Sequence, residues 1–181
     1  MEAFDLAGWM SNSSNLAALK PPVGNMLLYG NEFKVMLVAG PNVRNDYHVE
    51  AGEELFYQLK GDMVLKVVEG AASGEGSADV VFRDIHIREG STFCLPAGVP
   101  HSPQRLPDSL GLVVERDRRA GEVDLMRWYC DQPQCKAMLY EEAFVCHDLV
   151  KDLPPIIAGY RADEAKRTCK KCGSVDTFGL R

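Results

Sequence analysis

Short apolar segments separated by turn residues, between about residues 26 and 116, constrain the fold of this chain more than any other feature. Many short strands at a spacing of about 8–12 residues are typical of an all-β sandwich or barrel. Between these segments the sequence shows no helical periodicity, which counts against a parallel α/β sheet. The predicted strands cover residues 26–29, 33–39, 54–59, 63–68, 80–87, 91–95 and 110–115.

Two other segments have a different composition. Leu6, Trp9 and Met10 have helical spacing, so residues 1–20 are expected to form short helices that end at Lys20-Pro21-Pro22. Residues 69–79 are rich in glycine, alanine, serine and glutamate, which predicts a mobile hairpin loop. Whether this loop closes over a ligand pocket is left open.

After residue 116 the alternation weakens. Residues 123–129 suit either a helical turn or a short strand, the prolines within residues 152–155 predict a helix stop, and residues 162–167 suit a short helix. A chain of 181 residues fits one domain. We therefore expect a barrel core at about residues 26–116 and a C-terminal metal-binding tail at about residues 123–181, both within one domain of residues 1–181.

Composition and charge exclude several classes of protein. The net charge of −6 lacks the basic field of a nucleic-acid binder, although one or two arginines suffice for a small anion. No apolar stretch approaches the ~20 residues that cross a bilayer, so no membrane association is expected. The acidic N-terminus lacks the basic region of a signal peptide. We therefore expect a cytoplasmic location, where cysteines are thiols or metal ligands.

Two motifs carry the chemistry. In the first, Gly40 is followed by His48 and Glu54, and Gly61 comes after them; in the second, Gly90, Pro96-Ala97-Gly98, His101 and Arg105 follow in order. Together they resemble the two motifs of the cupin family, which are small jelly-roll barrels. The first motif departs from the family pattern because Asp46 stands where its first histidine is usual, and Glu54 lies slightly further on. In the second, Arg105 stands where asparagine is usual.

The residues that remain are two histidines and one carboxylate: His48, Glu54 and His101. Such a set leaves adjacent positions on octahedral Fe(II) free for a chelating substrate and O₂. We expect His48 and Glu54 on neighbouring strands of a hairpin and His101 just past a turn, all pointing into the barrel mouth. By contrast, His86 shares the polar face of an alternating strand and is expected to be solvated, whereas His147 is not assigned.

A closer resemblance extends over about residues 20–175. Its most specific strings are Pro21-Pro22-Val23-Gly24-Asn25 and His101-Ser102-Pro103-Gln104-Arg105, with further matches at residues 44–48, 53–61, 114–116 and 128–130. These strings are similar to the 3-hydroxyanthranilate 3,4-dioxygenase family, which depends on Fe(II). The resemblance implies ring opening by O₂ to 2-amino-3-carboxymuconate semialdehyde. That product cyclises to quinolinate, a precursor of NAD in the kynurenine pathway from tryptophan. It also implies a homodimer.

The resemblance assigns roles to individual residues as well. It implies that the three residues of the histidine and carboxylate set bind the iron, with Glu54 also touching the substrate. Arg44 and Arg105 match arginines that hold the substrate carboxylate, and Glu115 matches an acid near its hydroxyl and amino groups. Asn25 and Asp46 match polar residues that line the pocket. Taken alone, Arg44 would more often be a surface charge, and residues 115–117 could form a surface ion-pair run.

The cysteines are concentrated after residue 129. Cys169-Lys170-Lys171-Cys172 is a half-site for a tetrahedral metal, and Cys130 with Cys135 offers the second half at a wider spacing. Some members of the resembled family hold a second iron in a site of this kind. We expect a structural site for iron or zinc made by these four thiolates; free thiols in a flexible tail are the alternative. Cys94 is expected in the core, and Cys146 is unassigned.

Two other functions are compatible with a cupin barrel. One is a protein that binds a small acid or sugar without turnover, and the other is an isomerase or epimerase. The paired arginines Arg44 and Arg105 beside a three-ligand metal face favour the dioxygenase.

Overall fold

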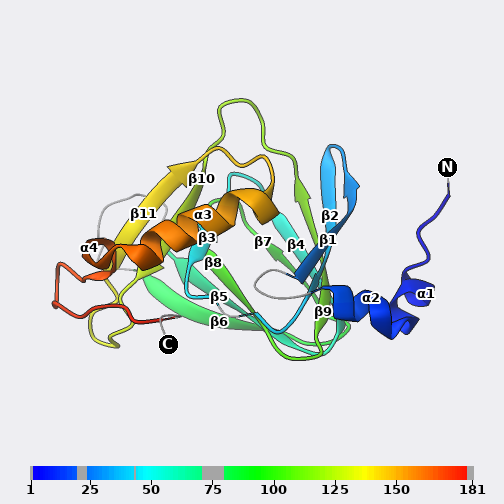
Figure 1. Ribbon diagram of the computed structural model, residues 1–181, viewed down its shortest axis with the longest axis horizontal. Coiled ribbons are helices and arrows are strands. Elements are labelled where there is room, and N and C mark those ends of the chain that lie inside the picture. The colour runs from blue at the N-terminus through cyan, green and yellow to red at the C-terminus, as the bar shows by residue number, and fades with distance from the viewer. Residues whose placement is uncertain (1, 20–23, 43, 71–79, 179–181) are drawn as a thin grey trace.

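The computed structural model describes residues 2–19, 24–42, 44–70 and 80–178. Within these ranges, two antiparallel sheets face each other and form a barrel (Figure 1). The first sheet has the order β1 (Gly24–Gly30), β2 (Phe33–Ala39), β9 (Leu110–Arg116), β4 (Glu54–Lys60) and β7 (Thr92–Leu95). The second has the order β11 (Met138–Phe144), β10 (Asp124–Tyr129), β3 (Tyr47–Val49), β8 (His101–Arg105), β5 (Met63–Glu69) and β6 (Val81–Ile87).

The predicted all-β jelly-roll barrel is confirmed. Each predicted strand segment overlaps an observed strand, and residues 123–129 contain a strand rather than a helical turn. The six-stranded sheet also includes β10 and β11, so the barrel continues beyond residue 116, the end of the predicted core. Strand β10 pairs with β3 on one side and with β11 on the other, so it is not an edge strand but part of the sheet.

The main core lies between the two sheets. It is built from buried side chains at alternating strand positions, which point to the inside of the barrel. Phe56 and Val113 come from the first sheet, and Leu65 and Val67 come from the second. These apolar residues hold the sheets together, and the functional side chains described below lie in the same interior.

The N-terminal helices are present as predicted. Helix α1 (Leu6–Ser11) begins after Asp5, whose carboxylate accepts a hydrogen bond from the Gly8 amide, and α2 (Ser13–Ala18) is capped in the same way by Asn12. The three apolar residues with helical spacing in this segment pack against Leu37 and Leu110 at one end of the first sheet. The predicted stop at residues 20–22 lies outside the described residues.

Helix α3 (Leu149–Ala162) covers the barrel on the side of β10 and β11 (Figure 1). The stop predicted at residues 152–155 is wrong, because Pro154 and Pro155 lie inside this helix. Each internal proline costs about 3 kcal/mol. Leu153 and Tyr160 compensate by burying one helix face, and the Tyr160 ring stacks on Trp128 at 4.2 Å between centroids. The predicted short helix at residues 162–167 is α4 (Glu164–Arg167).

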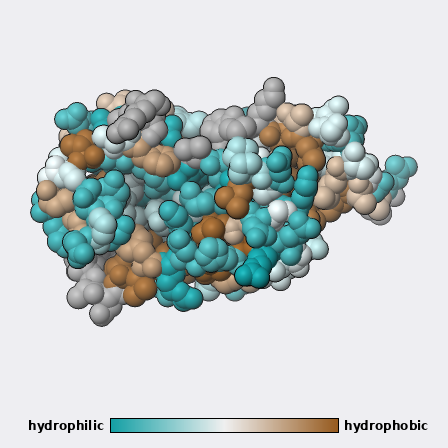
Figure 2. All heavy atoms as spheres, turned by 90° about the horizontal axis from the view of Figure 1, so that it is seen from below, coloured by the Kyte–Doolittle hydropathy of each residue, from teal (hydrophilic) through white to brown (hydrophobic). Residues whose placement is uncertain are grey.

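The outer surface corrects one further expectation. Cys94 is exposed, not a core residue, because Phe93 and Leu95 take the inward positions of β7 and Cys94 faces outward between them. Figure 2 shows a mostly hydrophilic face with separate apolar patches. Strands β5 and β6 pair as the predicted hairpin, whereas most of its loop, residues 71–79, lies outside the described residues. In the described ranges no helix is long and apolar enough to cross a membrane.

Candidate active site

A cavity opens between the two sheets, and most of the predicted site residues line it. Its polar lining comes from both sheets and from the segment before β3, and its apolar lining includes Leu149 and Leu153 of α3. The polar side chains are Asn25, Asn42, Arg44, His48, Glu54, His101 and Arg105. The barrel therefore encloses a pocket that combines apolar walls with convergent charged groups, as small-molecule sites do.

His101 and Glu54 meet across this cavity. His101 begins β8 and Glu54 begins β4, and Nε2 of His101 lies 2.8 Å from Oε2 of Glu54. Nδ1 of His101 is 3.1 Å from the Val99 carbonyl oxygen. We infer that Nδ1 carries the proton, because a carbonyl oxygen only accepts. The lone pair of Nε2 then faces the carboxylate, and Oε2 of Glu54 accepts no hydrogen bond from any of the described residues. Nε2 of His101 and Oε2 of Glu54 thus face each other with their lone pairs. A cation between them stabilises this arrangement, so the pair fits a metal.

His48 lies beside His101 but has a different partner. The two residues pair in register between β3 and β8, with ring centroids 5.5 Å apart. Nε2 of His48 is 2.7 Å from Oδ2 of the buried Asp124 on β10. Because Asp124 accepts there, Nδ1 of His48 is the nitrogen with the available lone pair. The potential ligand atoms of His48, Glu54 and His101 lie further apart than the sulfur atoms of the four cysteines, which form the tighter cluster among the described residues.

The expected hairpin relation between His48 and Glu54 is wrong. His48 lies on β3 of the six-stranded sheet, and Glu54 lies on β4 of the five-stranded sheet. The chain crosses from one sheet to the other in the four residues between these strands. The two side chains therefore approach the cavity from opposite walls of the barrel, which gives a more enclosed site than one hairpin could.

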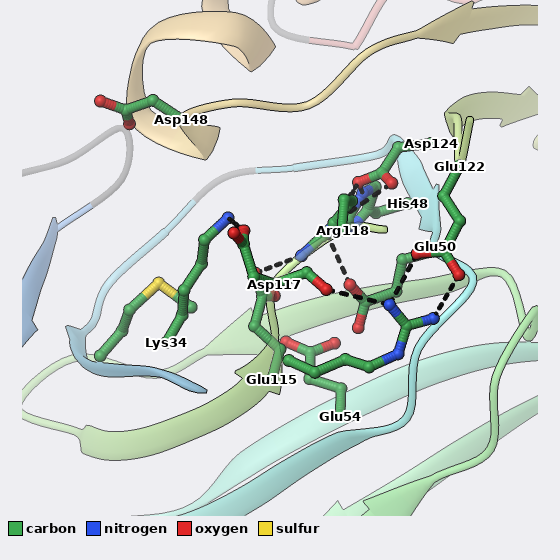
Figure 3. Close-up of polar contacts among 12 residues, drawn as sticks. Lys34, His48, Glu50, Glu54, Glu115, Asp117, Arg118, Glu122, Asp124 and Asp148 are labelled. Atoms are coloured by element: carbon green, nitrogen blue, oxygen red, sulfur yellow. Dashed lines mark hydrogen bonds and ion pairs between the residues drawn. The ribbon is translucent and has the colours of Figure 1, made fainter. Parts of the chain in front are cut away.

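Arg118 organises a buried charge network that was not predicted from the sequence. Its guanidinium pairs with Glu50 at 2.5 Å, with Asp124 at 2.7 Å and with Glu115 (Figure 3). Asp124 in turn holds His48, so the network joins one predicted metal ligand to Glu115. The available sequence signal was the run of charged residues 115–119 at the end of β9. The partners are too distant along the chain to reveal their pairing.

The network shifts the titration of its carboxylates. Burial raises the pKa of Glu115 to about 7, with a further contribution from the charge of Glu54, while Arg118 opposes the change. Burial likewise raises the pKa of Glu50 to about 9. For Asp124 burial acts in the same direction, but hydrogen bonds from His48 and Arg118 outweigh it and hold the pKa at about 2. One arginine thus faces three carboxylates of unequal acidity.

Glu115 itself lies beside Glu54, a residue of the cavity lining. It is the cross-strand partner of Glu54 between β9 and β4, and only 2% of it is exposed. It is not among the side chains that line the cavity. The alternative of a surface ion-pair run therefore applies only to its neighbours, since Arg116 pairs with Glu122 and Asp117 pairs with Lys34 near the surface.

The two arginines differ in their partners. Arg44 binds Asp46, which is almost fully buried, through both Nε, at 3.0 Å, and Nη2. Arg105 is 4% exposed, and its guanidinium has a hydrogen-bond contact with Gln58, at 3.4 Å. In the described part of the chain it has no carboxylate at ion-pair distance. Burial lowers the pKa of Arg105 to about 10, so it stays a cation at neutral pH.

Local packing holds this arginine against the cavity wall. A Cβ atom at Gly111 would lie 2.5 Å from Nη1 of Arg105 and 2.8 Å from Oε1 of Gln58. The backbone amide of Arg105 donates to the Asn42 side chain at 2.7 Å. The glycine therefore provides the space that the guanidinium occupies, and Asn42 fixes the strand that carries it.

The remaining polar residues of the prediction separate into two positions. Asn25 lines the cavity on β1, where Nδ2 is 4.0 Å from the Met36 sulfur. Asp46 stands behind Arg44 and is not part of the lining. His86 is exposed as predicted, and His147 is exposed as well.

The four cysteines of the predicted second site come together at the base of the C-terminal tail. Their sulfur atoms all lie within 4.8 Å of one another, with Cys130 to Cys172 at 3.6 Å and Cys135 to Cys169 at 3.5 Å. Hydrogen bonds from Ser174 lower the pKa of Cys172 to about 6, which favours a thiolate. This geometry suits a tetrahedral metal. Cys146 is buried elsewhere, and its assignment stays open.

The chain is similar to one well-defined group of proteins. A family model described as 3-hydroxyanthranilic acid dioxygenase matches residues 1–161. Relatives named 3-hydroxyanthranilate 3,4-dioxygenase match most of both chains. The one from Xanthomonas campestris is 46% identical over 171 residues, or 94% of this chain and 90% of the relative. The one from Yarrowia lipolytica is 43% identical over 176 residues, or 97% and 96%.

A fungal relative of the same name, from Neurospora crassa, is 44% identical over 169 residues, which is 93% of this chain and 87% of the relative. Among solved structures, the TT1209 protein from Thermus thermophilus is 22% identical with a TM-score of 0.47, and the match covers 66% of this chain and 100% of that chain. Identity above 40% over nearly the whole sequence decides the assignment. The chain belongs to the 3-hydroxyanthranilate 3,4-dioxygenase family and has its ring-opening activity in the kynurenine route to NAD.

Proposed function

We propose that the cavity between the sheets is where this activity takes place, with 3-hydroxyanthranilate bound by its carboxylate to Arg105. The observation that carries the proposal is the buried guanidinium of Arg105, which faces the cavity without a carboxylate partner among the described residues. Leaving a buried cation unpaired is costly, so such a site favours an anionic ligand. Arg44 provides a second guanidinium on the same cavity.

We assign His48, Glu54 and His101 as ligands of a catalytic Fe(II). The support is the contact between the His101 nitrogen and the Glu54 carboxylate, with no hydrogen bond to the carboxylate oxygen involved. Two histidines and one carboxylate are the usual donor set of non-haem iron oxygenases. Once bound, the iron would supply Lewis-acid and redox chemistry toward the substrate and O₂.

The side chains of the protein contribute binding, orientation and exclusion of water. Arg105 binds the carboxylate bidentately and Arg44 adds a second cation beside it, which together orient the ring. Met36, Phe56 and Val113 form apolar walls around the ring. Asn25 lines the pocket as a polar contact, and Asp46 keeps Arg44 in its orientation. A fixed ring brings the bond between carbons 3 and 4 to one position for every substrate molecule.

Glu115 is proposed to take up the proton that the substrate hydroxyl loses on binding. It lies next to Glu54 on the neighbouring strand. Because burial raises the pKa of Glu115 to about 7, the carboxyl is protonated below that pH and cannot act as a base. We expect kcat/KM to fall about tenfold per pH unit below pH 7 and to level off above it. Steady-state kinetics between about pH 5 and 9, run in parallel for the Glu115→Gln variant, measure this.

In the Glu115→Gln variant that acid limb should disappear and leave a lower, flatter profile. An unchanged limb in the variant would contradict the role of Glu115. Glu122→Gln is a suitable control, because Glu122 forms a surface ion pair with Arg116 and should leave the profile unchanged.

The four-cysteine cluster is proposed to bind a second iron or a zinc ion in a structural role. Replacing Cys172 by serine removes one of four thiolates, so we expect one metal ion fewer per chain and a melting temperature lower by about 5–15 °C. Turnover at saturating substrate should stay within about twofold, because the cluster does not line the cavity. Elemental analysis and thermal unfolding measure these effects. Cys94→Ser, at an exposed position outside the cluster, should change neither.

A homodimer in the cytoplasm completes the proposal. Exposed apolar side chains on the first sheet, including Leu27, Tyr29 and Phe33, offer a surface that a second copy could cover. The six cysteines are all free thiols in the structure, which agrees with a reducing compartment. Sedimentation of the purified protein determines the oligomeric state.

The function is tested by loading the protein with Fe(II) under nitrogen and then adding 3-hydroxyanthranilate and air. We expect uptake of O₂ together with the absorbance of the ring-opened product. Binding of the acid without O₂ uptake would favour a non-catalytic cupin. Conversion of the substrate to an isomer without O₂ uptake would favour an isomerase.

A further inference from the structure

Asp176, in the C-terminal tail, contacts the segment that carries Arg44. Oδ2 of Asp176 accepts a hydrogen bond from Nδ2 of Asn45 at 2.7 Å, although the two residues are 131 positions apart. Asn45 lies between Arg44 and Asp46, the ion pair on the cavity wall. A single hydrogen bond therefore joins the tail to the backbone segment that presents an arginine to the substrate.

The carboxylate is itself held firmly. Only 6% of Asp176 is exposed, and its Oδ2 also accepts from the Tyr160 hydroxyl at 2.7 Å. Its Oδ1 accepts from the Phe178 amide at 2.9 Å, and its carbonyl accepts from Nη1 of Arg167 at 2.7 Å. Helices α3 and α4 thus both fix Asp176, and a fixed acceptor can restrict the motion of what it binds.

The same tail contains half of the cysteine cluster. Thr168 and Val175 form a bridge that closes the turn holding Cys169 and Cys172, and Asp176 follows directly. This turn lies beyond residue 161, where the match to the family model ends. The contact between Asp176 and Asn45 therefore links the pocket to a segment outside the part of the chain that the family model matches.

We propose that Asp176 is a positioning residue for Arg44, so that the C-terminal tail contributes to affinity for the substrate carboxylate. The inference rests on the proposed role of Arg44 in binding that carboxylate. Without the hydrogen bond from Asn45, residues 44–46 gain conformational freedom. Ordering Arg44 when the substrate binds then lowers the net free energy of binding. The effect should appear in substrate affinity and not in the chemical step.

The test compares Asn45→Ala and Asp176→Ala with the wild-type full chain loaded with iron. We expect each variant to raise KM about tenfold, the value of one hydrogen bond to a charged group, with kcat within about twofold. The double variant should be no worse than either single variant, because both remove the same interaction. Calorimetric titration with 3-hydroxyanthranilate under nitrogen should show a matching loss of affinity without turnover.

Tyr160→Phe is the matched control. It removes another hydrogen bond to the same carboxylate oxygen but keeps the ring that stacks on Trp128 and leaves Asn45 untouched. We expect a lower melting temperature and a KM raised much less than in Asn45→Ala, because Arg167 and the Phe178 amide still hold Asp176. If Asp176→Ala does not fold, Asn45→Ala at a half-buried position still decides the question.

The inference and the proposed function can fail separately. If Arg44→Ala weakens binding and Asn45→Ala does not, the positioning role is overturned and the role of Arg44 stands. If Arg44→Ala leaves substrate binding unchanged, the positioning role of Asp176 and the proposed role of Arg44 are both overturned. A lower melting temperature of Asp176→Ala with unchanged KM would also overturn the positioning role.

Discussion

Replacing His101 by alanine should abolish turnover of 3-hydroxyanthranilate and reduce the iron content by one ion per chain. Nε2 of this residue faces Oε2 of Glu54 at 2.8 Å, and its imidazole is 2% exposed. Removing one of three ligands lowers metal affinity far more than the loss of a surface contact does, and the remaining two residues do not close a site. We expect activity below about one thousandth of the wild type.

The experiment must separate the two proposed metal sites. Iron content is best measured in a background in which Cys169 and Cys172 are both serine, so that only the cavity binds iron. His86→Ala is the matched control, because His86 lies exposed on β6 and should retain both iron and turnover. Full iron content in the His101→Ala protein would refute its role as a ligand. Where alanine at this buried position impairs folding, His101→Gln keeps the volume and tests the same point.

Replacing Arg105 by alanine should raise KM for 3-hydroxyanthranilate by about 100-fold or more. Truncating one partner of a buried charge pair costs about 2–5 kcal/mol, and here the missing charge would leave the substrate carboxylate without its main partner. Asn42 binds the backbone amide of Arg105 and Gly111 leaves space for its guanidinium, whereas the neighbouring Arg44 is already paired with Asp46. Steady-state kinetics and anaerobic titration with the substrate measure the loss.

Arg105→Lys separates charge from shape. A lysine keeps the positive charge but loses the planar fork that binds a carboxylate through two hydrogen bonds, so only part of the affinity should return. Arg83→Ala, at an exposed ion pair with Glu69, is the control for a general loss of positive charge. An Arg105→Ala protein with unchanged KM would show that the carboxylate binds elsewhere and would overturn the proposed orientation of the substrate.

The strand pattern was predictable where a strand alternates between buried and exposed positions over several residues, as β4 does. A strand at His48 was expected only from its motif and not from alternation, since the three residues of β3 are too few to show one. The helix α3 was mispredicted for a related reason. By local sequence rules, two adjacent prolines end a helix. The stacking of Tyr160 on Trp128 is a contact between segments distant in the chain, which local rules do not include.

The site shows the same division. Motif spacing identified Glu54, and the family resemblance identified Arg44 and Arg105; all three line the cavity. It gave no indication of Asp124 or Arg118, because Asp124 lies 76 residues from His48 and contacts it only across neighbouring strands. Charged side chains that become buried together leave no periodic signal, and their pairing is decided by which strands become neighbours.

The barrel class, six of the seven polar residues that line the cavity and the four cysteines that cluster in the tail were all predicted from the sequence. Each of these depends on local spacing or on a motif, and both are present in the chain before it folds. The folded chain was needed to show that His48 and Glu54 approach the cavity from opposite sheets, that Arg118 joins three carboxylates and that Asp176 reaches Asn45. These contacts follow from how strands and helices pack, and packing depends on the whole chain at once.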